Sequence, residues 1–248
     1  MNALIVHAHP EPLSFNGALT LLAAETFSSR GHEVIICDLY QMEFNPVSGR
    51  RNFSGRRNAQ FFKQHAEELH ANEHGGFAPD VQREMEKVFA ADLLILQFPL
   101  WWCSMPAILK GWIDRVFAFG TTYDMERWFD EGMFRGKRAM LSVTTGRPRS
   151  MYAPNGLAGD IEILLHPIQY GILRLVGYDV LPPHVTYAAD STTDDERQAM
   201  LEAYRDRLLK LDELEPIAYP PLEGFDENFR LRPGQVDHRP IRGDVPAP

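Results

Sequence analysis

Two adjacent tryptophans occupy a short loop bounded by prolines. The segment from Pro99 to Pro106 reads Pro-Leu-Trp-Trp-Cys-Ser-Met-Pro and follows an apolar run that ends at Phe98. Loops seldom expose adjacent tryptophans without a partner, and a planar aromatic cofactor is a natural one. A local hydrophobic cluster or a dimer contact would use the same residues. Composition alone leaves these interpretations open.

A second group of polar donors ends another apolar run. Thr144, Thr145 and Gly146 supply hydroxyl and N–H groups, and Tyr152 follows with a phenol. Such donors would stabilise the negative charge that collects at the N1–O2 edge of a reduced flavin ring. An ordinary turn from a strand into a helix is the alternative interpretation.

The first apolar run of the chain leads into a helix start. His9 and Ser14 stand just before Phe15 and Asn16. Free backbone N–H groups at a helix N-terminus attract anions, so a diphosphate would be held there. The simpler alternative is that Ser14 or Asn16 only caps the helix.

Several common site motifs do not occur in the sequence. It contains neither G-x-G-x-x-G nor a P-loop, and the hydrolase pattern G-x-S-x-G is missing too. The histidine pairs His7/His9 and His70/His74 come without an obvious third ligand, and Ala71 stands where H-E-x-x-H has glutamate. We therefore expect no metal site.

Five short apolar runs are expected to be the strands that position these groups. They cover residues 3–8, 33–39, 92–98, 137–144 and 178–185, and helices are expected over 15–31, 106–117 and 194–211. Regular alternation of strand and helix predicts an α/β fold, a doubly wound five-stranded parallel sheet with helices on both faces. Ligands of such sheets bind beyond the carboxyl ends of the strands, where the residues above lie.

Two segments fall outside this alternation. Residues 41–79 form a long connection, in which we expect one helix from Arg57 to Ala71. Residues 1–215 are expected to form the flavin-binding domain, and residues 216–248 form a proline-rich C-terminal extension. The extension should dock through its phenylalanines and become an arm or a disordered tail beyond about Arg232.

Composition narrows the classes of function. Lysine and arginine number 25 against 34 acidic residues, a net charge of −9, which argues against non-specific nucleic-acid binding. The two cysteines, Cys37 and Cys103, suggest neither a disulfide framework nor a zinc site. We see no signal peptide and no run of the ~20 apolar residues that a membrane span requires, so we expect a cytoplasmic protein.

An ordered set of segments between Ala3 and Phe229 resembles the FAD-dependent NAD(P)H:quinone reductases of the DT-diaphorase type. The matching segments are Leu-Ile-Val-His-Ala-His in the first strand, Ser14-Phe15-Asn16, Asp38-Leu39-Tyr40, Phe44-Asn45-Pro46, Gln97-Phe98-Pro99-Leu100, Pro106 to Trp112, Thr144-Thr145-Gly146, Ser150-Met151-Tyr152, Pro167-Ile168-Gln169, Gly171-Ile172-Leu173 and Phe225 to Phe229. This resemblance implies a flavodoxin-like fold and FAD, with FMN as the less favoured cofactor.

The resemblance also assigns residues to the cofactor. The diphosphate and adenine end of FAD would be held by His9, Ser14, Phe15, Asn16, Ala18 and Arg197, with Gln60 contributed across a dimer. The isoalloxazine ring would be surrounded by Pro99, Leu100, Trp101, Trp102, Cys103, Thr144, Thr145, Gly146 and Tyr152. Catalytic roles would belong to Thr145, Gly146 and Tyr152.

In this family the active-site pocket spans both subunits of an obligate homodimer, and NAD(P)H and the quinone occupy it in turn, which gives ping-pong kinetics. The pocket over the flavin would be lined by Trp102, Tyr123, Met125, Trp128, Arg147, Met151, Leu175, Phe225 and Phe229. Ring alignment and exclusion of water would then provide most of the rate enhancement of hydride transfer.

The sequence departs from the family pattern beside the expected flavin site. Ala158 stands where well-studied members have a histidine, so the proton relay through Tyr152 is in doubt. Arg147-Pro148-Arg149 replaces a small loop rich in glycine and serine, while Met125 and Leu175 replace aromatic residues. Either arginine would bind the 2′-phosphate of NADPH or an acidic acceptor. Two solvated arginines are the alternative.

Other functions remain compatible with the same resemblance. The acceptor would instead be a nitroaromatic compound, an azo dye or a free flavin. A non-catalytic flavoprotein subunit that senses redox state and docks on a membrane transporter is a third hypothesis. A flavodoxin that only carries electrons is less favoured, because it needs no nicotinamide pocket.

Overall fold

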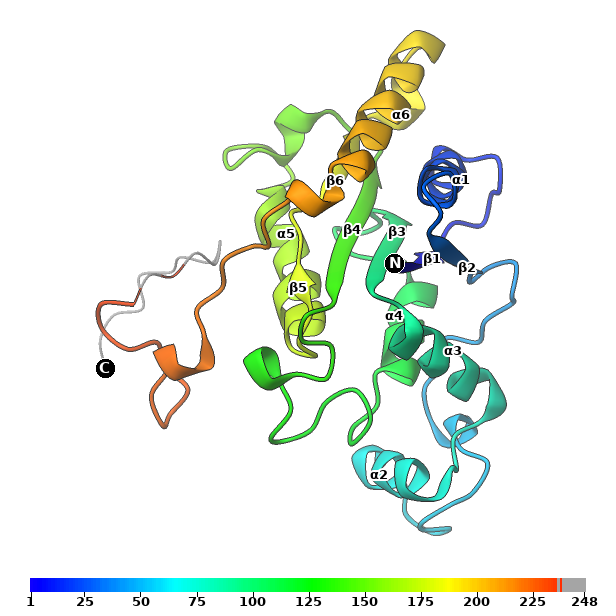
Figure 1. The fold of residues 1–248 in the computed structure, drawn as a ribbon, viewed down its shortest axis with the longest axis vertical. Coiled ribbons are helices and arrows are strands. Elements are labelled where there is room, and N and C mark those ends of the chain that lie inside the picture. Colours follow the sequence, from blue (N-terminus) through cyan, green and yellow to red (C-terminus); the bar gives the residue numbers. More distant parts are fainter. Residues whose placement is uncertain (236, 238–248) are drawn as a thin grey trace.

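Parallel strands form the centre of the computed structural model, which describes residues 1–235 and residue 237 (Figure 1). The strands are β1 (Asn2–His7), β2 (Glu33–Asp38), β3 (Leu93–Pro99), β4 (Arg138–Thr145), β5 (Asp179–Val180) and β6 (His184–Tyr187). Their order is β2-β1-β3-β4-β5, with β6 also paired to β4, and these pairings are parallel. The expected doubly wound parallel sheet is confirmed.

The fifth expected strand is interrupted. Val180 pairs with Ala139, and His184 pairs with Ser142, so β5 and β6 run along the same edge of β4. Two consecutive prolines, residues 182–183, lie between them. Proline lacks the N–H group that a strand ladder requires, so the edge strand breaks into two pieces there.

Helices cover both faces of the sheet. They are α1 (Phe15–Ser28), α2 (Gln64–His74), α3 (Pro79–Ala90), α4 (Ala107–Val116), α5 (Ile161–Ile168), continued by a π-helical turn (Gln169–Arg174), and α6 (Asp194–Leu209). Helices α1 and α6 pack on one face, while α3, α4 and α5 pack on the other. Neither α3 nor α5 was expected from the sequence.

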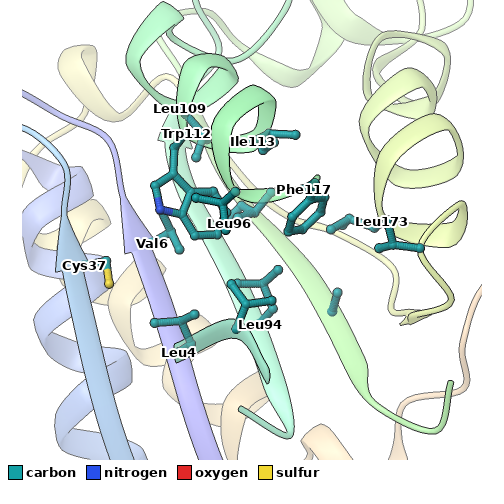
Figure 2. Close-up of a cluster of buried hydrophobic side chains, with 14 of the residues drawn as sticks. Leu4, Val6, Cys37, Leu94, Leu96, Leu109, Trp112, Ile113, Phe117 and Leu173 are labelled. Carbon is teal, nitrogen blue, oxygen red and sulfur yellow. The ribbon is translucent and has the colours of Figure 1, made fainter. Parts of the chain in front are cut away.

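Alternate side chains of one strand enter the two cores. Ile5 packs with Phe27 of α1, whereas Leu4 and Val6 lie in the cluster that contains Trp112 of α4 (Figure 2). All five are buried. A strand covered on both faces has no solvent side, which explains why the sequence shows continuous apolar runs and no alternation.

The helix expected from Arg57 to Ala71 is misplaced, because α2 begins only at Gln64. The side chain of Asn58 accepts hydrogen bonds from the backbone N–H groups of Gln60 and Phe61, at 2.9 and 3.0 Å. An asparagine turn of this kind competes with helix formation and keeps residues 57–62 in a loop.

The long connection is fastened to α4. A Cβ atom on Gly111 would lie 2.2 Å from the carbonyl oxygen of Pro46, so only glycine permits this approach. The buried Arg115 donates from Nε to Asn52 at 2.8 Å and forms an ion pair with Asp80 at 2.7 Å. These contacts hold the segment before α2 against the body of the domain.

The C-terminal extension docks beside β5 and the turn that precedes β4. The N–H of Ile217 donates to the carbonyl of Val180 at 2.8 Å, and the N–H of Leu222 donates to the Asp130 carboxylate at 2.5 Å. The first part of the extension is therefore joined to the domain by hydrogen bonds from its backbone. The tail expected beyond Arg232 falls largely on residues 236 and 238–248, which are outside the described residues.

No helix in the described part of the chain combines the length and apolar character needed to span a membrane.

Candidate active site

A cleft of about 290 Å³ opens at the carboxyl ends of β1, β3 and β4. Strand order reverses beside β1, because its two neighbours are β2 and β3, and ligands of doubly wound sheets bind at such a point. Of the predicted site residues, the cleft brings together His9, Ser14, Phe15, Asn16, Pro99, Leu100, Trp101, Thr144, Thr145 and Gly146. Ala189 and Asp190, from the turn before α6, complete the lining and were not predicted.

The N-terminus of α1 forms one end of the cleft. Ser14 is the N-cap, and its hydroxyl accepts the N–H of Gly17 at 3.1 Å. Phe15 and Asn16 also line the cleft, in the first turn of the helix. The first N–H groups of a helix have no partner within it, so this end is suited to a phosphate group.

Asn16 has a different role from the cap that its position suggested. Its buried side chain donates from Nδ2 to the hydroxyl of Thr144 at 2.8 Å and accepts from Nε2 of Gln97 at 2.8 Å. The hydroxyl of Thr144 accepts in this chain, so its own hydrogen stays available as a donor. Gln97 was missed as a site residue, although a polar side chain inside the apolar strand β3 is a signal that could have found it.

The tryptophan loop is a tight turn. Trp101 and Ser104 exchange two backbone hydrogen bonds of 3.0 Å. The two residues between them, Trp102 and Cys103, have φ angles of 51° and 58°, the left-handed region that side chains other than glycine rarely adopt. Trp102 is 100% exposed, and Trp101 lies 6.1 Å from the His9 ring between centroids. The turn therefore presents an indole beside the cleft at a cost in backbone strain.

The loop after β4 is tied to the turn after β6. The carbonyl of Arg147 accepts the Thr145 hydroxyl at 2.8 Å and the N–H of Ala188 at 3.1 Å. The guanidinium of Arg149 lies 5.9 Å from the centre of the Tyr187 ring. Arg147 is exposed, so its charge faces solvent next to the cleft.

Tyr152 and Met151 stand in a short 3-10 helix after this loop. Tyr152 is buried, with its ring 6.1 Å from that of Tyr187, and Met151 is half-buried. Neither belongs to the cleft lining among the described residues. The structure therefore places the predicted phenol donor outside the cleft lining.

The residues expected over the flavin line two other cavities. Tyr123 and Leu175 border a cavity of about 390 Å³ between α2, α4 and the π-helical turn. Trp128, Phe225 and Phe229 border a cavity of about 620 Å³ formed with the C-terminal extension. Within one chain, these two sets are separate from the cleft at β1, β3 and β4.

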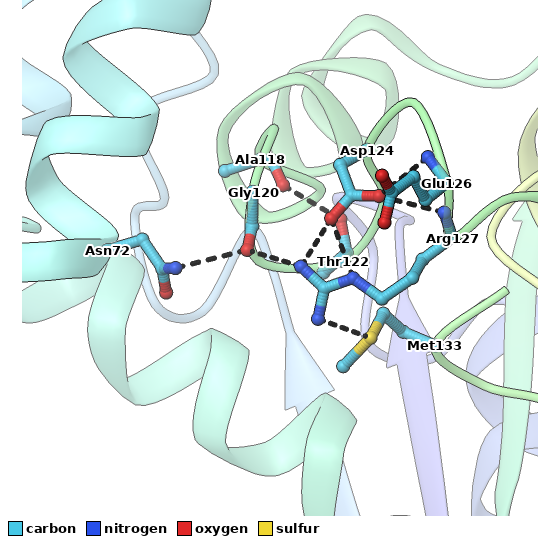
Figure 3. Close-up of polar contacts among 8 residues, drawn as sticks. All are labelled: Asn72, Ala118, Gly120, Thr122, Asp124, Glu126, Arg127 and Met133. Atoms are coloured by element: carbon cyan, nitrogen blue, oxygen red, sulfur yellow. Dashed lines mark hydrogen bonds and ion pairs between the residues drawn. The ribbon is translucent and has the colours of Figure 1, made fainter.

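Two hydrogen bonds to the Gly120 carbonyl fasten the segment that carries Tyr123 and Met125 (Figure 3). Asn72 of α2 donates to the carbonyl of Gly120 at 3.0 Å, and Arg127 donates to the same carbonyl at 3.2 Å. Met125 itself is 77% exposed. The loop is thus fixed at its base, while the Met125 side chain is exposed.

Besides Trp102, Cys103 and Tyr152, three more predicted cofactor residues are absent from the cleft lining. Arg197, in the first turn of α6, donates to the carbonyl of Thr192 at 2.6 Å and pairs with Asp194. Gln60 is exposed in the loop before α2. Ala18 lies in α1, one turn beyond the cap.

The cleft has the donors and rings that a flavin nucleotide requires. Helix N–H groups suit a diphosphate, hydroxyl and N–H groups of β4 suit the polar edge of the ring, and indoles suit its face. Asp190 constrains the arrangement, because its carboxylate lies 3.5 Å from where a Cβ on Gly146 would stand. Its charge would repel a phosphate group placed next to Gly146.

Comparison with known proteins agrees with this geometry. Residues 1–208 match the family model described as "flavodoxin-like fold". The chain belongs to this family. It is 42% identical to NAD(P)H dehydrogenase [quinone] 1 of Rattus norvegicus, over 92% of this chain and 84% of that protein. It is 41% identical to ribosyldihydronicotinamide dehydrogenase [quinone] of Mus musculus, over 90% and 97%.

Solved structures of the family superpose well on the chain. A Klebsiella pneumoniae protein described as a candidate quinone reductase is 38% identical, with a TM-score of 0.89, over 95% of this chain and 97% of that one. The NAD(P)H:quinone oxidoreductase of Methanothermobacter marburgensis is 25% identical, with a TM-score of 0.68, over 86% and 96%. The family is thus one of flavodoxin-like oxidoreductases that includes quinone reductases.

Proposed function

We propose that this protein is a flavoenzyme that transfers two electrons from NAD(P)H to quinones. The observation that carries the proposal is the cleft at the switch point of the sheet, with a free helix N-terminus at one end and an exposed indole beside it. Relatives more than 40% identical over most of the chain bear the names of quinone dehydrogenases. These names favour quinones over nitroaromatic or azo acceptors.

FAD is the proposed cofactor. It would supply the redox chemistry, which is acceptance of hydride from NAD(P)H and its donation to the quinone. Ser14, Phe15 and Asn16 would hold its diphosphate. Thr144, through the hydroxyl hydrogen left free by Asn16, would donate to the cofactor, as would the N–H groups near Gly146. Trp102 would exclude water from the reacting face.

FAD and FMN are distinguished by reconstitution. The test is direct binding of each flavin to the purified chain, followed by the quenching of flavin fluorescence. Tighter binding of FAD supports the proposal, because the second phosphate and the adenosine then add contacts. Equal affinity for FMN would show that the site ends at one phosphate.

We further propose a homodimer in which each active site takes residues from both chains. The residues expected over the cofactor lie in cavities apart from the cleft of the same chain, so a second copy would have to bring them to it. An interface would also cover large apolar side chains that are exposed in the single chain: Leu13, Phe61, Trp102, Met125, Leu157 and Phe229.

Mixing two inactive variants tests the shared site. Asn16→Leu should abolish cofactor binding in the cleft of its own chain. Phe225→Ser should disrupt the apolar surface that this chain would contribute to the active site of its partner. If chains exchange in an equal mixture, about half of the dimers contain one chain of each variant. In each of these mixed dimers one of the two sites combines an unmutated cleft with an unmutated Phe225, so the mixture should regain about a quarter of wild-type activity. Activity that stays at the level of the separate variants would contradict a site shared between chains.

The proposed reaction is tested with an acceptor panel. FAD-loaded protein should oxidise NADH or NADPH rapidly with menadione or benzoquinone, and more slowly with an azo dye or a nitroaromatic compound. Faster turnover with the azo dye would show that azo compounds, and not quinones, are the preferred acceptors. Binding of FAD without oxidation of either nicotinamide would favour a non-catalytic flavoprotein.

A further inference from the structure

Helix α2 carries three metal-ligating side chains at one place on its surface. His70, Glu73 and His74 each offer a ligand atom, and these atoms all lie within 4.8 Å of one another. Spacings of three and four residues put the side chains on the same face of a helix. Glu73 is the third ligand that the sequence spacing of the two histidines did not reveal.

The ring of His74 is already oriented for a metal ion. Its Nδ1 atom lies 2.8 Å from the carbonyl oxygen of His70, and a carbonyl can only accept, so Nδ1 carries the proton. The lone pair is therefore on Nε2, the atom that remains free to coordinate. A backbone carbonyl that fixes the tautomer in this way is the usual support of a metal-bound histidine.

We propose that His70, Glu73 and His74 form a binding site for a divalent transition-metal ion, Zn²⁺, with the fourth position left to water. Two neutral imidazoles and one carboxylate are a ligand set that Zn²⁺ accepts with nitrogen and oxygen at about 2.0–2.2 Å. The two rings lie 4.2 Å apart between centroids, and Glu73 and His74 are exposed. Small side-chain rotations suffice to close the site, and solvent can deliver the ion.

The site has a consequence for helix stability because α2 has little apolar packing. The helix has 11 residues, and its buried positions are Glu67, Glu68 and Ala71, so it gains little from apolar packing. Short helices with little packing are marginal in water. An ion that joins successive turns would stabilise α2.

That stabilisation would reach the loop that carries Tyr123. Glu68 accepts the N–H of Phe119 at 2.8 Å, and the Asn72 amide donates to Gly120 at 3.0 Å. The ring of His65 stacks on that of Phe119, 5.1 Å apart between centroids. A more stable α2 would therefore hold Phe119 and Gly120, the residues through which this loop contacts the helix, more firmly.

The first experiment is calorimetric titration of ZnCl2 into chelator-treated, FAD-loaded protein. Wild type should bind one ion per chain, and His70→Gln and His74→Gln should each weaken binding by about 100-fold, since loss of even an outer-sphere partner costs about 10–100-fold. Glu73→Gln should weaken it less. His32→Gln, which removes a histidine far from α2 in the sequence, should bind as wild type does.

A second measurement reports on the helix itself. Zinc should slow amide hydrogen exchange in residues 64–74 of wild type, with no slowing in His74→Gln. Equal zinc affinity in wild type, His70→Gln and His74→Gln would overturn the proposal, as would exchange in α2 that ignores zinc. Weakening by His32→Gln alone would place the ion elsewhere.

Discussion

The side-chain amide of Asn16 donates to the hydroxyl of Thr144 at 2.8 Å, and this bond joins the first turn of α1 to the end of β4 beneath the candidate active site. Gln97 completes the link from β3. One end of the cleft is suited to an anion and the other to the edge of an aromatic ring. The three side chains set the distance between these two ends.

Removing the Thr144 hydroxyl tests this link. Thr144→Val leaves the buried Asn16 amide unpaired, so the free energy of unfolding should fall by about 1–3 kcal/mol. FAD affinity should fall by about tenfold, which corresponds to about 1.4 kcal/mol for the lost donor. Urea unfolding and fluorescence titration measure the two effects. Thr144→Ser keeps the hydroxyl and should resemble wild type; a valine variant that binds FAD normally would disprove the role.

The elements that bury continuous apolar surface were predictable from sequence. Ile5 and Val6 enter opposite cores, so the run that contains them can only be a two-sided strand. The loop before α2 was mispredicted, because the helical composition around Arg57 hides the turn made by the Asn58 side chain. Local hydrogen bonds of this kind leave little trace in residue periodicity.

The candidate site was predictable where it follows strand ends and unpredictable where it depends on packing. Thr144 and Pro99 were placed by the rule for parallel sheets. Asp190 comes from a turn distant in sequence, and nothing in its surroundings marks it. The separation of Tyr123 from the cleft likewise arises from tertiary structure.

The two cysteines should react differently. Burial raises the pKa of the Cys37 thiol to about 12, whereas Cys103 is exposed in the tryptophan turn. Only thiolates attack disulfide reagents, so one thiol per native chain should react with such a reagent near neutral pH, and both should react in urea. FAD should protect Cys103 if the cofactor lies against the turn. Equal labelling with and without FAD would place the ring elsewhere.

The two arginines after β4 should affect cofactor choice unequally. Both arginines are exposed, but Arg147 directly follows Gly146 of the cleft lining, whereas the Arg149 guanidinium lies over the Tyr187 ring. We predict that Arg147→Ala raises the KM for NADPH by about tenfold and leaves that for NADH unchanged, because it loses a charge-assisted phosphate contact. Arg149→Ala is the matched control and should change the ratio less. An unchanged NADPH/NADH preference in Arg147→Ala would refute this assignment.

Acid should destabilise the fold through His184. Burial, reinforced by Arg207, lowers its pKa from 6.5 to about 4. The unfolded chain therefore takes up the proton first, and stability falls as the pH drops from about 6.5 towards about 4. Urea midpoints measured across this range should decline less steeply in His184→Asn. Burial also lowers the pKa of His7, so part of the slope should remain in that variant.

The most direct test of the central claim separates the two halves of the reaction in an anaerobic stopped-flow instrument. NADPH or NADH mixed with the FAD-loaded protein should bleach the visible flavin absorbance. Menadione mixed with the reduced protein should then restore this absorbance at a rate at least as high as steady-state turnover. This result would establish a flavin that is reduced by nicotinamide and oxidised by quinone. A flavin that stays oxidised with both nicotinamides, or stays reduced in the presence of menadione, would contradict the account.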